Sequence, residues 1–141
     1  MTGPDDFELP RLLGYVERRL SERLVRRLSA AGSSLNEWRV LARLVEGAGS
    51  AMSDVASALD VPPSTATKLI DAMVAANLVY RRGDENDRRR VVVHLAPRGR
   101  AAHVKLAPLV QAEHAELTAL ADEGDLQQLT RILTQLSRQV S

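Results

Sequence analysis

The sequence has 141 residues with a net charge of +1; 45% of them are hydrophobic, 26% charged and 3% aromatic. This composition indicates a folded chain of one domain or two small fused units, and excludes both disorder and a large aromatic substrate cleft. Cysteine is absent, which excludes disulfides and thiolate metal sites, and without a signal region or a long apolar run we expect a cytoplasmic protein with no membrane partner.

The first third of the chain predicts two helices. Apolar residues recur every three or four positions from about Leu9 to Leu28, the pattern of one amphipathic helix. Gly32 ends this pattern. Ser34, followed three residues later by Glu37, forms a capping-box pair that predicts the start of the next helix.

Two shorter helices are expected next, separated by a tight turn at residues 60–62. Ser53 is the expected N-cap of the first one. Pro63 suits the first position of the second one, which should end near Ala76, because a proline there lacks only an N–H that the helix does not need. Two short helices joined by a three-residue turn have helix-turn-helix spacing.

The hydrophobic period then changes from 3.6 to 2, which predicts a β-hairpin built from LVYRR and VVVHL. Val91, Val93 and Leu95 should share one face, and Pro97 and Gly99 should end the second strand. Residues 81–100 contain seven arginines and three acids, a local net charge of +4. The positive charge is therefore concentrated at the hairpin.

The remaining sequence predicts a long helix over about residues 98–120 and a last helix after a break at residues 122–125. Leu126, Leu129, Leu133, Leu136 and Val140 alternate spacings of three and four in the last helix. This spacing is typical of a seam that packs against another helix.

A helix-turn-helix followed by a hairpin with a basic tip is a winged helix, and both parts suit DNA. The exposed candidates near the start of the second helix are Ser64, Thr65, Thr67 and Lys68. Their hydroxyl and ammonium groups can bond phosphates or base edges. Two alternatives stay open: the hydroxyls serve as caps of the first turn, and the lysine is an ordinary surface residue.

The region from Asp87 to Gly99 resembles the wing signature of the MarR family of bacterial transcriptional regulators. Asp87 and Arg89 precede a valine-rich strand, Leu95 follows, and Gly99 closes the motif; Ala96 stands where the family usually has threonine. The resemblance extends from about Leu9 to Val140, and PPSTATKLIDAMVAANLVYRR is similar to the family's recognition helix and first wing strand, with Asn77 at a position that commonly holds glycine.

The resemblance implies a mainly α-helical homodimer with a small β-hairpin wing. Residues 1–32 and 98–141 would form the helical dimerisation region, and residues 33–97 the winged helix-turn-helix domain that binds DNA. By the same match Arg89 would enter the minor groove, oriented by a salt bridge from Asp87, while Arg88 and Arg90 would contact phosphates.

The family also implies a small phenolic or anionic effector in a pocket near the dimerisation helices. We assign Tyr15, Arg19, Trp38 and Arg39 to that pocket, with packing of the aromatics and solvent exposure of the arginines as the alternative. His103 and His114 are eleven residues apart on one helix, about 16 Å along its axis, so we expect no metal there. No cofactor motif or catalytic constellation is present, so an enzyme is not expected.

The sequence therefore predicts a transcriptional regulator that binds a pseudo-palindromic operator as a homodimer, most simply a ligand-responsive repressor. Two alternatives remain at this stage. The winged helix is a protein-interaction module without DNA affinity, or the protein regulates transcription without any ligand.

Overall fold

The structure is a computed structural model, and it describes residues 8–140. In chain order its elements are α1 (Leu9–Ala30), α2 (Leu35–Leu44), β1 (Ser50–Ala51), α3 (Met52–Leu59), α4 (Pro63–Ala75), β2 (Val79–Gly83), β3 (Val91–Leu95), α5 (Pro97–Leu120) and α6 (Glu123–Ser137). The predicted class, mainly helical with a small sheet, is confirmed. Between residues 8 and 140, no helix combines the length and the apolar character that crossing a membrane requires.

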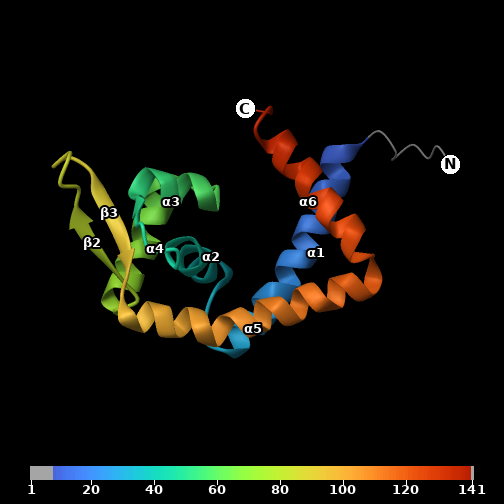
Figure 1. Ribbon diagram of the computed structural model, residues 1–141, viewed down its shortest axis with the longest axis horizontal. Helices are drawn as coiled ribbons and strands as arrows, with labels where there is room; N and C mark the ends of the chain where they lie inside the picture. Colours follow the sequence, from blue (N-terminus) through green and yellow to red (C-terminus); the bar gives the residue numbers. More distant parts are fainter. Residues whose placement is uncertain (1–7, 141) are drawn as a thin grey trace.

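The helices and strands gather into two groups, joined by the long helix α5 (Figure 1). Helices α2, α3 and α4 lie with the sheet at one end of α5. Helices α1 and α6 lie at its other end and cross each other in the view of Figure 1. Pro108 stands inside α5, where it removes one backbone hydrogen bond of the helix.

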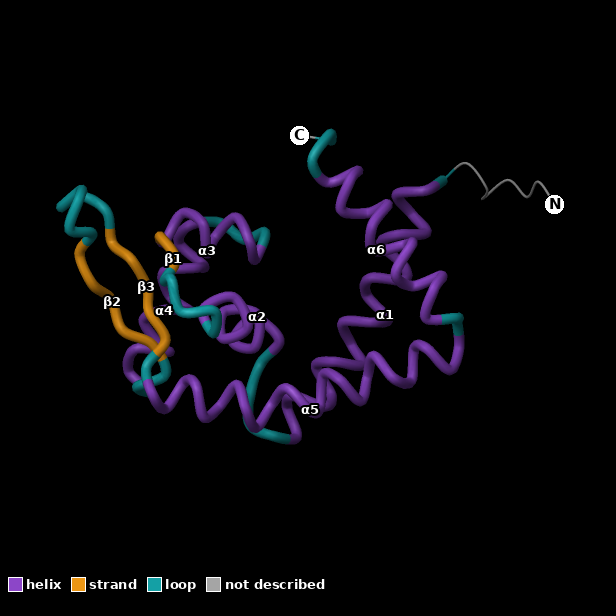
Figure 2. Tube along the Cα trace, in the orientation of Figure 1, coloured by secondary structure: helices purple, strands orange, loops and turns teal. Residues whose placement is uncertain are grey.

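The sheet contains a third strand that the sequence did not predict. Its order is β1-β3-β2, antiparallel throughout, with Val79 opposite Leu95 in the hairpin and Ser50 opposite Val93 in the added pair (Figure 2). Because Ser50 and Ala51 are drawn into the sheet, α3 begins immediately after them. The prediction of Ser53 as its N-cap is wrong: Ala51 holds that position, without a side-chain cap.

The hydrophobic core lies in the winged-helix group, where side chains from α2, α3, α4, β2 and β3 meet one residue each from α1 and α5. Its fully buried large residues are Leu28, Val40, Leu41, Leu44, Val55, Ile70, Met73, Val79 and Val93. Leu106 of α5 is 3% exposed and joins the same cluster. Both long helices are therefore anchored in the core of the winged helix.

Helix ends mostly follow the predicted capping residues. The Ser34 hydroxyl accepts the N–H of Glu37 at 3.1 Å, and the Glu37 carboxylate accepts the Ser33 hydroxyl at 3.0 Å. Pro63 is the first residue of α4, as expected. The break before the last helix is shorter than predicted, because the Asp122 side chain accepts the N–H of Gly124 and starts α6 at Glu123.

The connections around β2 depend on two backbone conformations. Asn77 has φ 60°, the left-handed conformation expected for it, and leads α4 into β2. Gly99 was predicted to end the second strand. In the structure it lies instead in the first turn of α5, where it is buried. A Cβ built on Gly99 would lie 2.0 Å from the carbonyl oxygen of Leu78, so the start of α5 can approach β2 only with glycine at this position.

Candidate nucleic-acid interface

The outer face of α4 carries the predicted polar residues. Ser64, Thr65, Thr67 and Lys68 are all exposed, while Ala66, Ile70 and Met73 turn inward. The N-cap position is Pro62, which makes no side-chain cap, and the Thr67 hydroxyl donates to the carbonyl of Pro63 at 2.9 Å. The hydroxyls of Ser64, Thr65 and Thr67 therefore do not occupy the N-cap position. Together with Lys68 they form an exposed polar face on the first two turns of α4.

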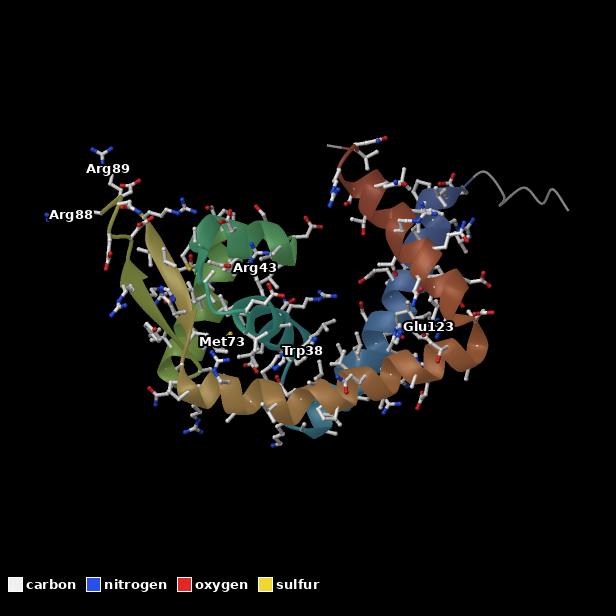
Figure 3. All side chains as sticks on the ribbon, in the orientation of Figure 1. Trp38, Arg43, Met73, Arg88, Arg89 and Glu123 are labelled. Atoms are coloured by element: carbon white, nitrogen blue, oxygen red, sulfur yellow. The ribbon has the colours of Figure 1, made fainter. Side chains whose placement is uncertain are left out.

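The wing tip is ordered by its two aspartates. Asp84 Oδ1 accepts the N–H of Asn86 at 2.9 Å, and Asp87 Oδ1 accepts the N–H of Arg89 at 3.0 Å. The backbone closes the loop with a bond from the Asp84 N–H to the Arg90 carbonyl at 2.9 Å. Arg88 and Arg89 are exposed and extend away from the tip (Figure 3).

The contact that orients Arg89 differs from the prediction. No ion pair joins the side chains of Asp87 and Arg89 among the residues described, because the short aspartate side chain bonds the backbone two residues on, as in an Asx turn. Asp87 therefore fixes the backbone from which the exposed side chain of Arg89 projects.

Two arginines beside the tip are paired with carboxylates of the helix-turn-helix. Arg90 Nη2 lies 3.5 Å from Asp54 Oδ2 of α3, and the guanidinium of Arg81 in β2 pairs with Asp71 of α4. Arg90, the predicted phosphate contact, is thus paired with a carboxylate of α3. Sequence reasoning missed Asp54, Asp71 and Arg81, since no local spacing links residues on separate elements.

The four residues assigned to an effector pocket form two separate groups. The Arg19 guanidinium lies 5.3 Å from the ring centre of Tyr15 on α1, whereas Trp38 of α2 stacks on His103 of α5 with 5.0 Å between ring centres. Arg39 is exposed. A hollow of about 380 Å³ beside α2 and the start of α5 is lined by other residues.

A buried carboxylate ties α1 to α5. Glu113, only 4% exposed, accepts hydrogen bonds from Arg23 at 3.0 Å and from Arg27 at 3.2 Å. Glu116 completes the cluster by pairing with both arginines. The hydrogen bond from Arg27, followed by its charge, lowers the pKa of Glu116 below its ordinary value, so Glu116 is ionised near neutral pH.

Beyond this cluster, α1, α5 and α6 leave large apolar side chains exposed. The group comprises Leu9, Leu12, Leu13, Val16, Leu120, Leu129, Ile132, Leu133, Leu136 and Val140, each at least 37% exposed. No residue of α6 is buried. So many exposed large apolar side chains at one end of the molecule are typical of a protein interface rather than of a free surface.

The sequence and the fold both match known transcriptional regulators. Residues 31–90 match the sequence model of the MarR family. Over 104 residues the chain is 26% identical to the putative transcriptional regulatory protein for the hcr operon of Thauera aromatica, a match that covers 74% of this chain. The chain spans only 63% of that relative's length.

Two solved structures share nearly the whole fold. AbsC, a MarR family transcriptional regulator from Streptomyces coelicolor, superposes with a TM-score of 0.84 at 28% identity, covering 99% of this chain and 97% of AbsC. A mutant MarR from E. coli complexed with operator DNA superposes with a TM-score of 0.81 at 25% identity, covering 96% and 99% of the respective chains.

Proposed function

The chain belongs to the MarR family of transcriptional regulators, and from this premise we propose that it binds double-stranded operator DNA as a homodimer. The family consists of regulators and not of enzymes. In the proposed complex, α4 enters the major groove and the wing reaches the adjacent minor groove. Two symmetric copies would then read a pseudo-palindromic operator in successive major grooves.

One observation carries the proposal: the polar face of α4 and the arginine tip belong to one packed unit. Strands β2 and β3 hold the tip, and α4 is anchored beside them through Ile70, Met73 and Val79 in the shared core. Arg88 and Arg89 are exposed, with no ion pair to either side chain among residues 8–140. The unit thus offers hydroxyls, an ammonium and free guanidiniums, the groups that bond phosphates and base edges.

The homodimer is supported by the exposed apolar side chains of α1, α5 and α6. A monomer would leave them in water, whereas two copies related by a two-fold axis bury the same patch on both subunits. Leu28 is buried within its own subunit, so the last position of the predicted α1 stripe is not available to a partner. The interface we propose therefore lies far from the wing.

We further propose that the protein represses transcription and that a small-molecule effector controls its binding to DNA. An operator that overlaps a promoter would be blocked by the bound dimer. An effector would act by favouring one spacing of the two winged helices over another. Tyr15 with Arg19, and Trp38 with Arg39, remain the predicted contacts of a phenolic or anionic molecule. A ligand-independent regulator is the alternative, and melting experiments with phenolic acids separate the two.

The direct test is selection of binding sites from random duplex DNA, followed by titration of the selected duplex by fluorescence anisotropy at several salt concentrations. We expect Lys68→Ala to reduce the salt slope by about 0.9, the value for one lost phosphate contact. Arg89→Ala should weaken binding as well. Arg26→Ala, exposed on α1, is the matched control and should bind like the wild type.

If Lys68→Ala and Arg89→Ala both retain the affinity and the salt slope of the wild type, the assigned interface is wrong. If the wild type enriches no duplex at all, the alternative of a protein-interaction module is favoured.

A further inference from the structure

Two ion pairs connect the wing to the helix-turn-helix, and the proposed function does not use them. Arg81 of β2 pairs with Asp71 of α4, and Arg90, just before β3, lies 3.5 Å from Asp54 of α3. In each pair an arginine of the wing meets a carboxylate of the helical part.

Asp71 lies on the face of α4 that we place against DNA. It follows Ser64 by seven residues and Lys68 by three, and seven residues at about 100° per residue return to within about 20° of the starting direction. Its side chain is 59% exposed. A carboxylate on this face is repelled by phosphates, which raises the question of why it stands there.

Neither pair is placed where it could add much to stability. The side chains of Asp54 and Arg90 are each 52% exposed, and Arg81 is 32% exposed beside the more open Asp71. Exposed pairs of this kind contribute on the order of 1 kcal/mol or less. A role in positioning and in charge is the better account of both.

We propose that Asp54 and Asp71 are specificity-determining residues, which hold Arg90 and Arg81 and so withhold two positive charges from DNA phosphates. This inference rests on the proposed DNA binding. Phosphate contacts carry no sequence information, so an arginine released from its carboxylate strengthens binding to any duplex. The pairs also tie the wing to α4 through Asp71 and to α3 through Asp54, which keeps the spacing that a cognate site requires.

The experiment measures the dissociation constants of the full chain for its selected duplex and for a random duplex over a range of salt. Asp71→Asn should bind the random duplex about 3–10-fold more tightly, and its salt slope should steepen by about 0.9 because one more phosphate is contacted. Binding to the selected duplex should gain less, so the ratio of the two constants falls. Asp54→Asn tests the second pair in the same way.

Two further variants separate pairing from simple charge. Asp71→Glu keeps the carboxylate and should keep the wild-type slope. Asp60→Asn removes the same charge from the turn before α4 without releasing an arginine, since no ion pair to Asp60 occurs among residues 8–140. Asparagine also accepts the φ of 53° at this position. This variant should keep the wild-type slope.

Unchanged slopes and ratios in both Asp71→Asn and Asp54→Asn would overturn the inference. An equal steepening in Asp60→Asn would overturn it too, because the effect would then be one of general charge. Both outcomes differ from failure of the proposed function, in which the wild type itself binds neither duplex.

Discussion

Substitution of Gly99 by alanine gives the sharpest test of how the wing is joined to α5. The added Cβ would lie 2.0 Å from the carbonyl oxygen of Leu78 and 2.7 Å from Cδ1 of Leu95. The leucine methyl can rotate away, but the carbonyl cannot, because it accepts the N–H of Ala96 at 3.0 Å. The start of α5 must therefore move away from β2 by roughly 1 Å to restore an ordinary contact distance.

The expected cost follows from three contributions. Forced movement in a packed region costs about 1–3 kcal/mol. Weakening of the hydrogen bond between Ala96 and Leu78 adds about 1 kcal/mol, while the better helix propensity of alanine returns about 1 kcal/mol. Because 2.0 Å is a severe overlap, we expect a net loss of about 2–3 kcal/mol. For a chain of this size that lowers the melting temperature by roughly 6–12 °C.

Thermal and urea unfolding at one fixed protomer concentration measure this loss. Gly124→Ala is the control, because its Cβ would meet nothing closer than 3.6 Å and the residue lies in the first turn of α6. It should leave the protein as stable as the wild type or up to about 1 kcal/mol more stable. If Gly99→Ala is as stable as Gly124→Ala, the close approach of α5 and β2 does not exist in solution.

Three stability or assembly effects and one ligand effect are also expected. Ser34→Ala removes the acceptor for the Glu37 N–H and should cost about 1 kcal/mol in urea unfolding. Arg27 lowers the pKa of Glu116 in the folded protein. The contribution of Glu116 to the free energy of unfolding is therefore present above the ordinary pKa of 4.5 and is lost as pH falls through the pKa of the folded state. Glu116→Gln should therefore reduce the pH dependence of stability on the acid side. Leu133→Glu should convert the proposed dimer to monomers in sedimentation; a mass unchanged from that of the wild-type dimer would refute the proposed α6 interface. At least one member of a panel of phenolic acids should raise the melting temperature of the protein. If none does, the alternative of a ligand-independent regulator is favoured.

Local patterns predicted most of the helices because their causes are local. Ser34 caps α2 and Pro63 opens α4 as expected, since both effects act within one turn of the chain. The start of α3 was missed for a long-range reason. Ser50 and Ala51 pair with β3 some forty residues later, and a two-residue strand carries no alternation that a sequence pattern could reveal.

In the candidate nucleic-acid interface, too, the features with local causes could be predicted from the sequence, and those set by tertiary packing could not. The exposure of Lys68 and of the wing arginines follows from helix and hairpin periodicity, so it could be predicted. The partners of Arg81 and Arg90 depend on how the wing packs against α3 and α4, and no spacing in the sequence encodes that. Glu113 is a further case, because its partners on α1 lie 86 and 90 residues away along the chain.

Pro108 gives the long helix α5 a point at which it can bend. It lies eleven residues from the start of the helix at Pro97, a length of about 16 Å. Without the hydrogen bond that proline removes, bending is easiest at this point. A change in bend of about 10° there would swing the attached winged helix by about 3 Å at the start of α5, and by more at the wing tip. In the proposed dimer the two swings add, so a few degrees at one residue change the reach across a DNA turn.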